Sequence, residues 1–225
     1  MTDFQRARTP EQRQVRRSTI LATAREMLSE MGVSELSFNR LSERAGLAKS
    51  NILRYFDSRE AILLELLDDE QKAWLADLGP VLAQRTEPNA PVRERVAALA
   101  ESVAESLTAR PLLNELVSAQ ASVLEHNVSP DGAARYKRAA LDNVRTFATL
   151  IGRSLPELPE SGAVEVAGAL VMLASSAWTY SQPSAAMRAA YEADPDLAAH
   201  CIVFRDAIEH LATLLISGAL ASRTR

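Results

Sequence analysis

The sequence has few of the residues that cross-link a small fold or bind a metal. Its 225 residues include three histidines and one cysteine, Cys201, which excludes a disulfide framework and leaves too few ligands for a structural zinc site. A single buried thiol is typical of a protein in the reducing cytoplasm. Because 47% of the residues are apolar, we expect a sizeable folded core rather than disorder. We expect neither a metal nor another cofactor.

Long hydrophobic runs are also absent. The first 17 residues are partly basic with no apolar run behind them, so we expect no secretory signal. The longest uncharged stretch lies between Glu165 and Arg188, and Pro183 interrupts it. Its strongly apolar part spans about 15 residues, which is too short to cross hydrocarbon comfortably. We interpret it as a helix buried in a protein bundle, and we expect a cytoplasmic protein with no membrane partner.

Charge is distributed unevenly along the chain. Residues 1–59 contain 11 Lys and Arg against 7 Asp and Glu, a net charge of +4, whereas residues 60–225 contain 14 against 22, a net charge of −8. A basic N-terminal part joined to an acidic remainder indicates that only the N-terminal part meets a polyanion.

Glycine and proline are sparse and no alternating β-branched run is present, which predicts an all-α chain of about nine helices. The first helix is expected to begin at Thr9-Pro10, with Thr9 as its cap, and to end at Gly32. Gly79-Pro80 is expected to end or kink the fourth. The remaining helices are predicted at 37–46, 48–54, 58–79, 91–109, 111–127, 129–153, 162–181 and 196–220, with 154–161 and 182–195 as loops.

The segment from Ser37 to Glu60 is the most informative part of the chain. It predicts two short helices joined at Gly46, a residue that takes positive φ without strain, and this is the pattern of a helix-turn-helix. The inward apolar side chains of such a motif would be Leu41, Ala45, Leu47, Ile52 and Phe56.

The opposite face of the second short helix is then free to enter a major groove. Lysine and arginine meet guanine acceptors or phosphates, asparagine pairs with adenine, and tyrosine reaches phosphates. The start of the next helix offers unpaired backbone N–H groups beside Arg59, an arrangement that binds anions. The predicted DNA-binding residues are therefore Ser37, Asn39, Arg40, Ala48, Lys49, Ser50, Asn51, Arg54, Tyr55 and Arg59.

Residues 14–67 resemble the DNA-binding domain of TetR/AcrR-type helix-turn-helix transcriptional regulators. The resemblance lies in Ala45-Gly46-Leu47, in Tyr55-Phe56 and in Ser58-Arg59-Glu60-Ala61-Ile62, where the family usually has Ser-Lys-Glu-x-Leu. Two residues depart from the family pattern. Ala48 stands where a capping Ser or Thr is usual, so the recognition helix lacks a side-chain cap, and Leu53 replaces the usual tyrosine.

This resemblance implies a DNA-binding domain over residues 1–57, with the helix-turn-helix at 37–56, and a helical ligand-binding and dimerisation domain over 58–225. The implied function is a repressor that a small-molecule effector releases from a palindromic double-stranded operator. The implied homodimer forms through helices 162–181 and 196–220, although burial of these apolar helices within one monomer stays open. Candidate ligand-binding residues are Asn114, Gln120, Phe147, Met172 and Trp178.

Two other functions are weighed against this one. An all-α enzyme is not expected, because His126, His200 and His210 are scattered and no Gly-rich phosphate loop or nucleophile elbow is present. A protein–protein adaptor built on the same helices is disfavoured by the basic recognition face, and salt-dependent DNA binding would distinguish the two.

Overall fold

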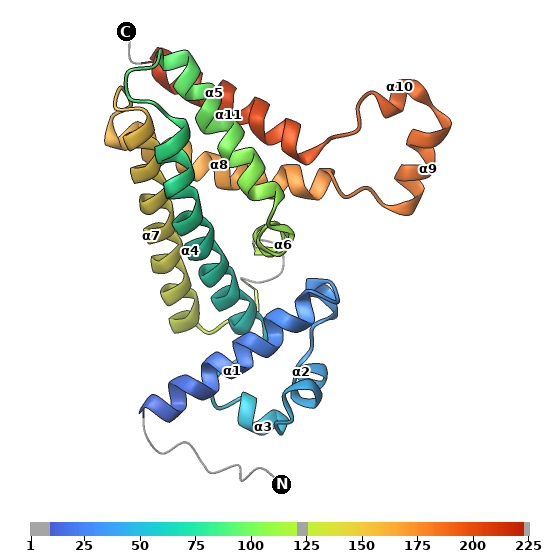
Figure 1. Cartoon of the computed structure of the whole chain (residues 1–225). Helices are drawn as coiled ribbons and strands as arrows, with labels where there is room; N and C mark the ends of the chain where they lie inside the picture. Colours follow the sequence, from blue (N-terminus) through green and yellow to red (C-terminus); the bar gives the residue numbers. More distant parts are fainter. Residues whose placement is uncertain (1–9, 121–125, 223–225) are drawn as a thin grey trace. The chain divides into compact units, whose positions relative to one another are not determined.

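The computed structural model describes residues 10–120 and 126–222, and over these ranges the chain is all-helical (Figure 1). Two compact units are formed: unit 1 comprises 1–67 and 119–136, and unit 2 comprises 68–118 and 137–225. The elements are α1 (Pro10–Leu28), the 3₁₀-helix η1 (Val33–Glu35), α2 (Phe38–Ala45), α3 (Lys49–Ile52), α4 (Arg59–Arg85), α5 (Val92–Thr108), α6 (Pro111–Ala119), α7 (Pro130–Ser154), α8 (Glu160–Tyr180), α9 (Ala185–Ala193), α10 (Pro195–Ala198) and α11 (Phe204–Ala221).

The fourth helix is longer than predicted. It continues through Gly79 and Pro80 to Arg85, so of the two predicted outcomes, an end or a kink, the end is wrong. Proline removes one backbone donor, but the side chains on either side, Leu78 and Leu82, are almost fully buried and hold the next turn in place. At Gly79 the absence of a side chain lets Leu150 of α7 approach closely. Packing therefore overrides the local break signal.

The segment before the last helix also differs from the prediction. Residues 182–195, expected to form a loop, contain α9, and the last helix begins at Phe204 rather than at 196. Alanine-rich sequence has high helix propensity, and the hydroxyl of Ser184 accepts a hydrogen bond from the Met187 N–H as an N-cap. The prolines and acidic residues that suggested a loop lie instead at or near the ends of short helices.

Two predicted features fall outside the described residues. The capping role of Thr9 cannot be placed, since the description begins at Pro10. The sixth predicted helix, 111–127, is described as α6 up to Ala119, and 121–125 lie outside the described residues.

Unit 1 is built on one apolar stripe of α1. Its buried residues Ile20, Leu21, Ala24, Met27 and Leu28 recur every three or four positions, which places them on one helix face. This face packs against α2. Burial of each such aliphatic side chain contributes about 1.5–3 kcal/mol, so the stripe fixes α1 against the helices that follow.

In unit 2, α4 and α7 run side by side in the same direction. Near the middle of both helices, Asn143 Nδ2 donates hydrogen bonds to Asp68 Oδ1 (2.8 Å) and Gln71 Oε1 (3.1 Å). One turn further, the rings of Trp74 and Phe147 meet edge to face with centroids 4.9 Å apart. Helix α11 packs on α5 and on α8 (Figure 1).

Helix α8 is the one helix in the described part of the chain that is long and apolar enough to span a membrane. By length and composition alone it would suffice: an 18-residue stretch of it has a mean hydropathy of 1.3, and 33% of that stretch is buried. Its buried residues recur at helical spacing on one face, whereas Met172 and Tyr180 are exposed. The predicted burial in a bundle therefore holds for one face of α8 within this chain.

A buried arginine joins the start of α5 to the loop after α7. The guanidinium of Arg95 donates to the carbonyl oxygens of Ser154 (2.9 Å) and Ala90 (3.1 Å) and to the carboxylate of Glu157 (3.0 Å). The side chain of Arg95 is 6% exposed and that of Glu157 is 41% exposed. The hydrogen bond from Arg95 lowers the pKa of the Glu157 carboxyl below its ordinary value.

We expect Glu157→Gln to reduce the free energy of unfolding by about 1 kcal/mol at pH 7, because a charge-assisted hydrogen bond becomes a neutral one at a partly exposed site. A carboxyl with a lowered folded-state pKa stabilises above its unfolded pKa, and that stabilisation is lost as pH falls through the folded pKa. Urea unfolding should therefore show the difference at pH 7 and a smaller one near pH 3. Glu87→Gln, at an exposed carboxylate, is the control. A difference that does not shrink on acidification would contradict this assignment.

Candidate nucleic-acid interface and cavity

The turn between α2 and α3 has the geometry that its glycine predicts. Gly46 has φ 62° and ψ 29°, the left-handed region, and it is the one positive-φ residue of the described chain. The Gly46 N–H donates to Glu43 O (3.3 Å) and the Leu47 N–H to Ser42 O (3.0 Å). These two bonds form a Schellman motif, which satisfies the last carbonyls of α2 and directs the chain into α3.

The apolar side of the helix-turn-helix is buried as predicted for four of its five residues. Leu41, Leu47, Ile52 and Phe56 are at most 7% exposed, and Ala45 is half-buried. The backbone continues in helical turns beyond Ile52, because the Leu53, Tyr55 and Phe56 N–H groups donate to the carbonyls of Lys49 and Ile52. With this side turned inward, the opposite side of α3 faces solvent.

That solvent-facing side carries two cations. Lys49, Ser50 and Arg54 are exposed and Asn51 is half-buried. Within the described residues, neither Lys49 nor Arg54 has an acidic partner. Ala48, the N-cap of α3, makes no side-chain capping bond, as its lack of a hydroxyl predicts.

The arginines of α2 are paired within unit 1. Arg40 Nη1 lies 3.2 Å from Glu35 Oε2, and Arg44 lies 3.1 Å from Glu30 and 3.4 Å from Glu26. The charge of α2 is therefore largely balanced locally, whereas that of α3 is not. This contrast makes α3 the electropositive element of the motif.

The other predicted interface residues occupy the ends of these helices. The hydroxyl of Ser37 caps α2 by accepting from the Arg40 N–H (3.3 Å), and Asn39 is exposed in the first turn. Tyr55 is half-buried, and its carbonyl accepts a hydrogen bond from Arg17 (2.6 Å).

Arg59 makes its hydrogen bonds inside unit 1. Its guanidinium donates to the carbonyls of Ser34 (3.3 Å) and Leu36 (3.2 Å) and pairs with Glu60 (3.0 Å). The hydroxyl of Ser58 accepts from the Ala61 N–H (3.0 Å), which uses one free donor at the start of α4. Arg59 thus fastens the η1 segment to α4, and a contact with DNA would be additional to this packing role.

Sequence reasoning missed Arg17, which positions the end of α3. Its guanidinium lies 4.2 Å from the centroid of the Phe56 ring, and it donates to Tyr55 O and to Glu65 Oε1 (2.8 Å) on α4. One residue of α1 therefore joins the turns that follow α3 to α4. Its place three and four residues before the buried Ile20 and Leu21 puts it at the edge of the apolar face, and this spacing is the signal that could have revealed it.

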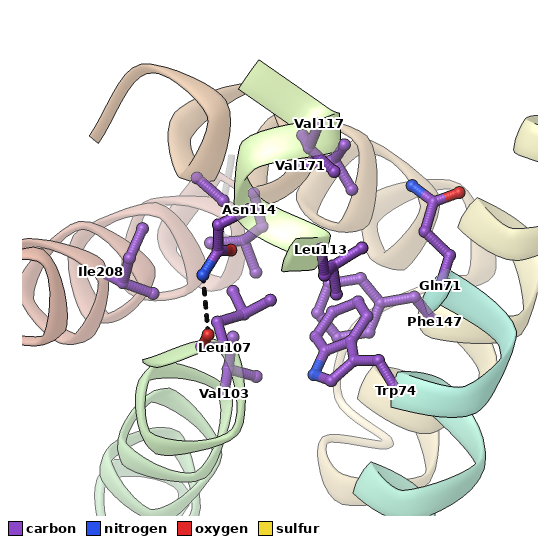
Figure 2. A pocket seen from close by; sticks show the side chains of 12 residues that line it. Gln71, Trp74, Val103, Leu107, Leu113, Asn114, Val117, Phe147, Val171 and Ile208 are labelled. Atoms are coloured by element: carbon purple, nitrogen blue, oxygen red, sulfur yellow. Dashed lines mark hydrogen bonds between the residues drawn. The ribbon is translucent and has the colours of Figure 1, made fainter. Parts of the chain in front are cut away.

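Unit 2 contains a small, partly open apolar cavity between α4, α5, α6, α7, α8 and α11 (Figure 2). Its volume is about 20 Å³. Trp74 and Phe147 form one wall, and the other apolar lining residues are aliphatic. The lining residues are Gln71, Trp74, Val103, Leu107, Leu113, Asn114, Val117, Phe147, Leu170, Val171, Ala174 and Ile208.

Two amides give this cavity its polar character. Asn114 Nδ2 donates to Leu107 O (2.7 Å), the bond drawn in Figure 2, and Gln71 Oε1 accepts from Asn143. Within the described residues, Asn114 Oδ1 and Gln71 Nε2 have no hydrogen-bond partner. One acceptor and one donor therefore remain available beside an otherwise apolar space.

Models of known families match both units. Residues 20–66 match the model described as bacterial regulatory proteins of the tetR family, and residues 68–223 match that of the tetracyclin repressor-like C-terminal domain. The chain belongs to the TetR family. It is therefore a TetR-family transcriptional regulator, and the resemblance seen in the N-terminal residues is confirmed over most of its length.

Curated HTH-type transcriptional regulators match part of this chain. The regulator EthR of Mycolicibacterium smegmatis is 36% identical over 75 residues, covering 30% of this chain and 35% of EthR. RutR of Escherichia coli K12 is 33% identical over 63 residues, covering 28% of this chain and 30% of RutR. The matches thus span about a third of these relatives.

Solved TetR-family structures share the whole fold. A regulator from Pectobacterium atrosepticum has a TM-score of 0.62 at 18% identity, covering 92% of this chain and 96% of its own. One from Rhodococcus sp. RHA1 has a TM-score of 0.57 at 18% identity, covering 92% and 97%. At these identities the likeness establishes the all-helical TetR fold alone.

Within this TetR-family fold, the cavity includes two of the five predicted ligand residues, Asn114 and Phe147. Met172 is 68% exposed on α8, and Trp178 packs edge to face on Phe204 with ring centroids 5.2 Å apart. Gln120 follows α6 and is not among the lining residues. Gln71 and Trp74 also line the cavity and were not among the predicted ligand-binding residues.

Proposed function

We propose that this regulator is a cytoplasmic repressor that binds a palindromic operator as a homodimer and leaves it when a small molecule enters the unit 2 cavity. In this proposal residues 1–57 bind DNA and residues 58–225 bind the effector and the second subunit. Lys49, Asn51 and Arg54 meet base edges or nearby phosphates. The other contacts come from Ser37, Asn39, Arg40, Ala48, Ser50, Tyr55 and Arg59.

The observation that carries the DNA-binding proposal is the contrast between α2 and α3. Exposed cations that are already paired gain little from a phosphate, because they must first give up their carboxylate partners. Lys49 and Arg54 have no such partner among the described residues, and the buried Ile52 and Phe56 fix the helix that carries them. A rigid helix with unpaired cations and an asparagine matches the donor and acceptor pattern of a major groove.

The small DNA interface of a single DNA-binding domain supports a dimer. A single short recognition helix reads only a few base pairs, which is too little to select one site in a genome. Two DNA-binding domains related by a two-fold axis read half-sites about 34–36 Å apart. The apolar side chains exposed on α8 and α11, such as Met172 and Leu214, support a dimer through these two helices.

The lining of the cavity supports an uncharged, mainly apolar effector. Among the described residues no charged side chain lines it, and an isolated charge would lose its hydration there without compensation. A hydroxyl, amide or carbonyl on the ligand would hydrogen-bond to Asn114 Oδ1 or Gln71 Nε2. At about 20 Å³ the cavity holds little more than a water molecule, whereas drug-sized ligands occupy about 300–1,000 Å³. Binding therefore requires wall side chains to move.

Helix α4 is the proposed route from the cavity to DNA. It begins at Arg59 beside the helix-turn-helix and continues without a break to the cavity residues Gln71 and Trp74. A ligand that displaces Trp74 acts on this same helix. The ligand can change the operator affinity by no more than the ratio of its own affinities for the DNA-binding conformation and for the released one.

We expect operator DNA to weaken ligand binding by about 5- to 150-fold, corresponding to a coupling of about 1–3 kcal/mol, and the ligand to weaken operator binding by the same factor. A ligand is first found by thermal-shift screening of small uncharged compounds and is then titrated calorimetrically with and without the operator. Asn114→Leu should weaken ligand binding and leave the affinity for DNA unchanged. Leu141→Ala, on α7, serves as the control. Equal ligand affinities in the two titrations would rule out release by the ligand.

A further inference from the structure

Residues 182–203, hereafter the arm, connect α8 to α11 and contain α9 and α10 (Figure 1). No residue of the arm is buried: Pro183, Ala190 and Tyr191 are half-buried and the others are exposed. Cys201 lies in this segment, so the predicted buried thiol is in fact exposed. The arm therefore packs its side chains on no core of its own subunit.

The hydrogen bonds of the arm are internal or lie at its two ends. The side chains of Ser184 and Asp194 cap α9 and α10, and Arg188 Nη1 donates to Pro183 O (3.0 Å). At its base, the rings of Trp178 and Phe204 pack edge to face. The arm thus has a fixed root and satisfied backbone ends, but a helix as short as α9 is marginal in water unless it packs against something.

Exposed apolar side chains are concentrated in and beside the arm. Four large ones lie within it, and four more lie on the helices that flank it, α8 and α11. The former are Met187, Leu197, Ile202 and Val203, and the latter are Val164, Met172, Tyr180 and Leu214. Exposed apolar side chains in such number mark contacts with another molecule.

The charge of the arm speaks against two kinds of partner. It carries Arg188 against Glu192, Asp194 and Asp196, a net charge of 1 − 3 = −2 with histidine neutral. An acidic segment is repelled by nucleic acid and by an anionic lipid surface. Its flanking helices are those of the proposed dimer, so a second copy that covers α8 and α11 also lies beside the root of the arm.

We propose that the arm clasps the second copy of this chain, with its apolar side chains packed on α8 and α11 of the partner subunit. This inference rests on the proposed homodimer and adds a second contact to it. Because the subunits are related by a two-fold axis, each arm contacts the other subunit. Clasping supplies the packing that α9 and α10 lack within one chain.

The first test is the double variant Met187→Asp and Leu197→Asp. Sedimentation equilibrium should show a dimer dissociation constant raised at least 10-fold. The melting temperature at low protein concentration should stay that of the wild type, because neither side chain is buried within its own subunit. Leu141→Asp, an equivalent change at an exposed position of α7, should leave the dissociation constant unchanged.

The second test uses Cys201, the single cysteine of the chain. A benzophenone maleimide is attached to it in a mixture of ¹⁴N- and ¹⁵N-labelled protein, which is then irradiated. Crosslinked peptides of mixed isotope composition, joining the arm to α8, α11 or the other arm, are the expected result. Crosslinks within single chains alone would overturn the clasp.

The two tests separate the arm from the dimer. If the arm variants dimerise like the wild type while Leu214→Arg is monomeric, the clasp is wrong and the dimer through α8 and α11 stands. If the wild type itself is monomeric at micromolar concentration, both the clasp and the proposed dimer are wrong. Binding of the wild type to neutral lipid vesicles, without crosslinks between chains, would overturn the clasp in favour of a membrane surface.

Discussion

Leu214→Arg is expected to convert the dimer into a monomer and to lower affinity for the palindromic operator by about 10³-fold or more. Leu214 is 56% exposed on α11, so the arginine does not disrupt the core of its own subunit. In the dimer it would place a charge at the centre of an apolar interface, where an unpaired charge is costly. A monomer then reads one half-site, and its affinity approaches that of non-specific binding.

Light scattering and fluorescence anisotropy with the operator would measure the two effects. Leu141→Arg, at an exposed leucine of α7, is the matched control and should remain dimeric and bind normally. Both variants should keep the helicity of the wild type, because neither change reaches the core of a subunit. A dimeric Leu214→Arg that binds the operator like the wild type would place the interface elsewhere.

The helix-turn-helix was predictable because its signals are local. A glycine that must adopt positive φ, apolar residues at fixed offsets and a capping serine each act within a few residues. The all-α class follows equally from helical periodicity. What escaped prediction at Pro80 was a tertiary effect: burial of Leu78 and Leu82 keeps the helix intact where the local sequence alone would end it.

The cavity was harder to predict for the same reason. Asn114 and Phe147, which line the cavity, were predicted because they lie on helices expected to enclose it. Gln71 and Trp74 were missed because their place in the cavity depends on how α4 packs against α7, which periodicity does not reveal. Helical spacing alone likewise cannot distinguish the face of α8 that carries Leu170 from the one that carries Met172, since both are apolar.

The arm shows a different limit of sequence reasoning. Its alanines have high helix propensity, yet its prolines and acidic residues favour a loop, and no periodic stripe decides between them. Such a stripe arises where a helix packs on its own core, and the arm has none to pack on. Segments whose packing partner is another chain are therefore hard to assign from one sequence.

Arg54→Ala is expected to weaken operator binding by about 1–3 kcal/mol if the guanidinium contacts a base edge, and Asn51→Ala by a similar amount. These losses correspond to a factor on the order of 5 to 150. The physical reason is that Arg54 is exposed with no carboxylate partner among the described residues, so its hydrogen-bonding capacity is available to DNA. A base contact is specific, and the variants should lose discrimination among operator sequences as well as affinity.

Lys49→Ala separates the contribution of charge from that of base contacts. If Lys49 meets a phosphate, the variant should weaken binding to all sequences about equally and reduce the slope of log affinity against log salt by about one unit. Anisotropy titrations at several salt concentrations, with the operator and with a scrambled duplex, measure both quantities.

Arg44→Ala is the matched control for these three variants. It also removes an exposed side chain from the helix-turn-helix, and the charge it removes is already paired with Glu30 and Glu26. The hydrogen bonds that Arg44 donates to Glu30 and Glu26 raise its pKa, as expected for a cation paired within unit 1. We expect its operator affinity to lie near that of the wild type. If Arg44→Ala weakens binding as much as Arg54→Ala, or if Arg54→Ala and Asn51→Ala both bind like the wild type, α3 is not the recognition helix.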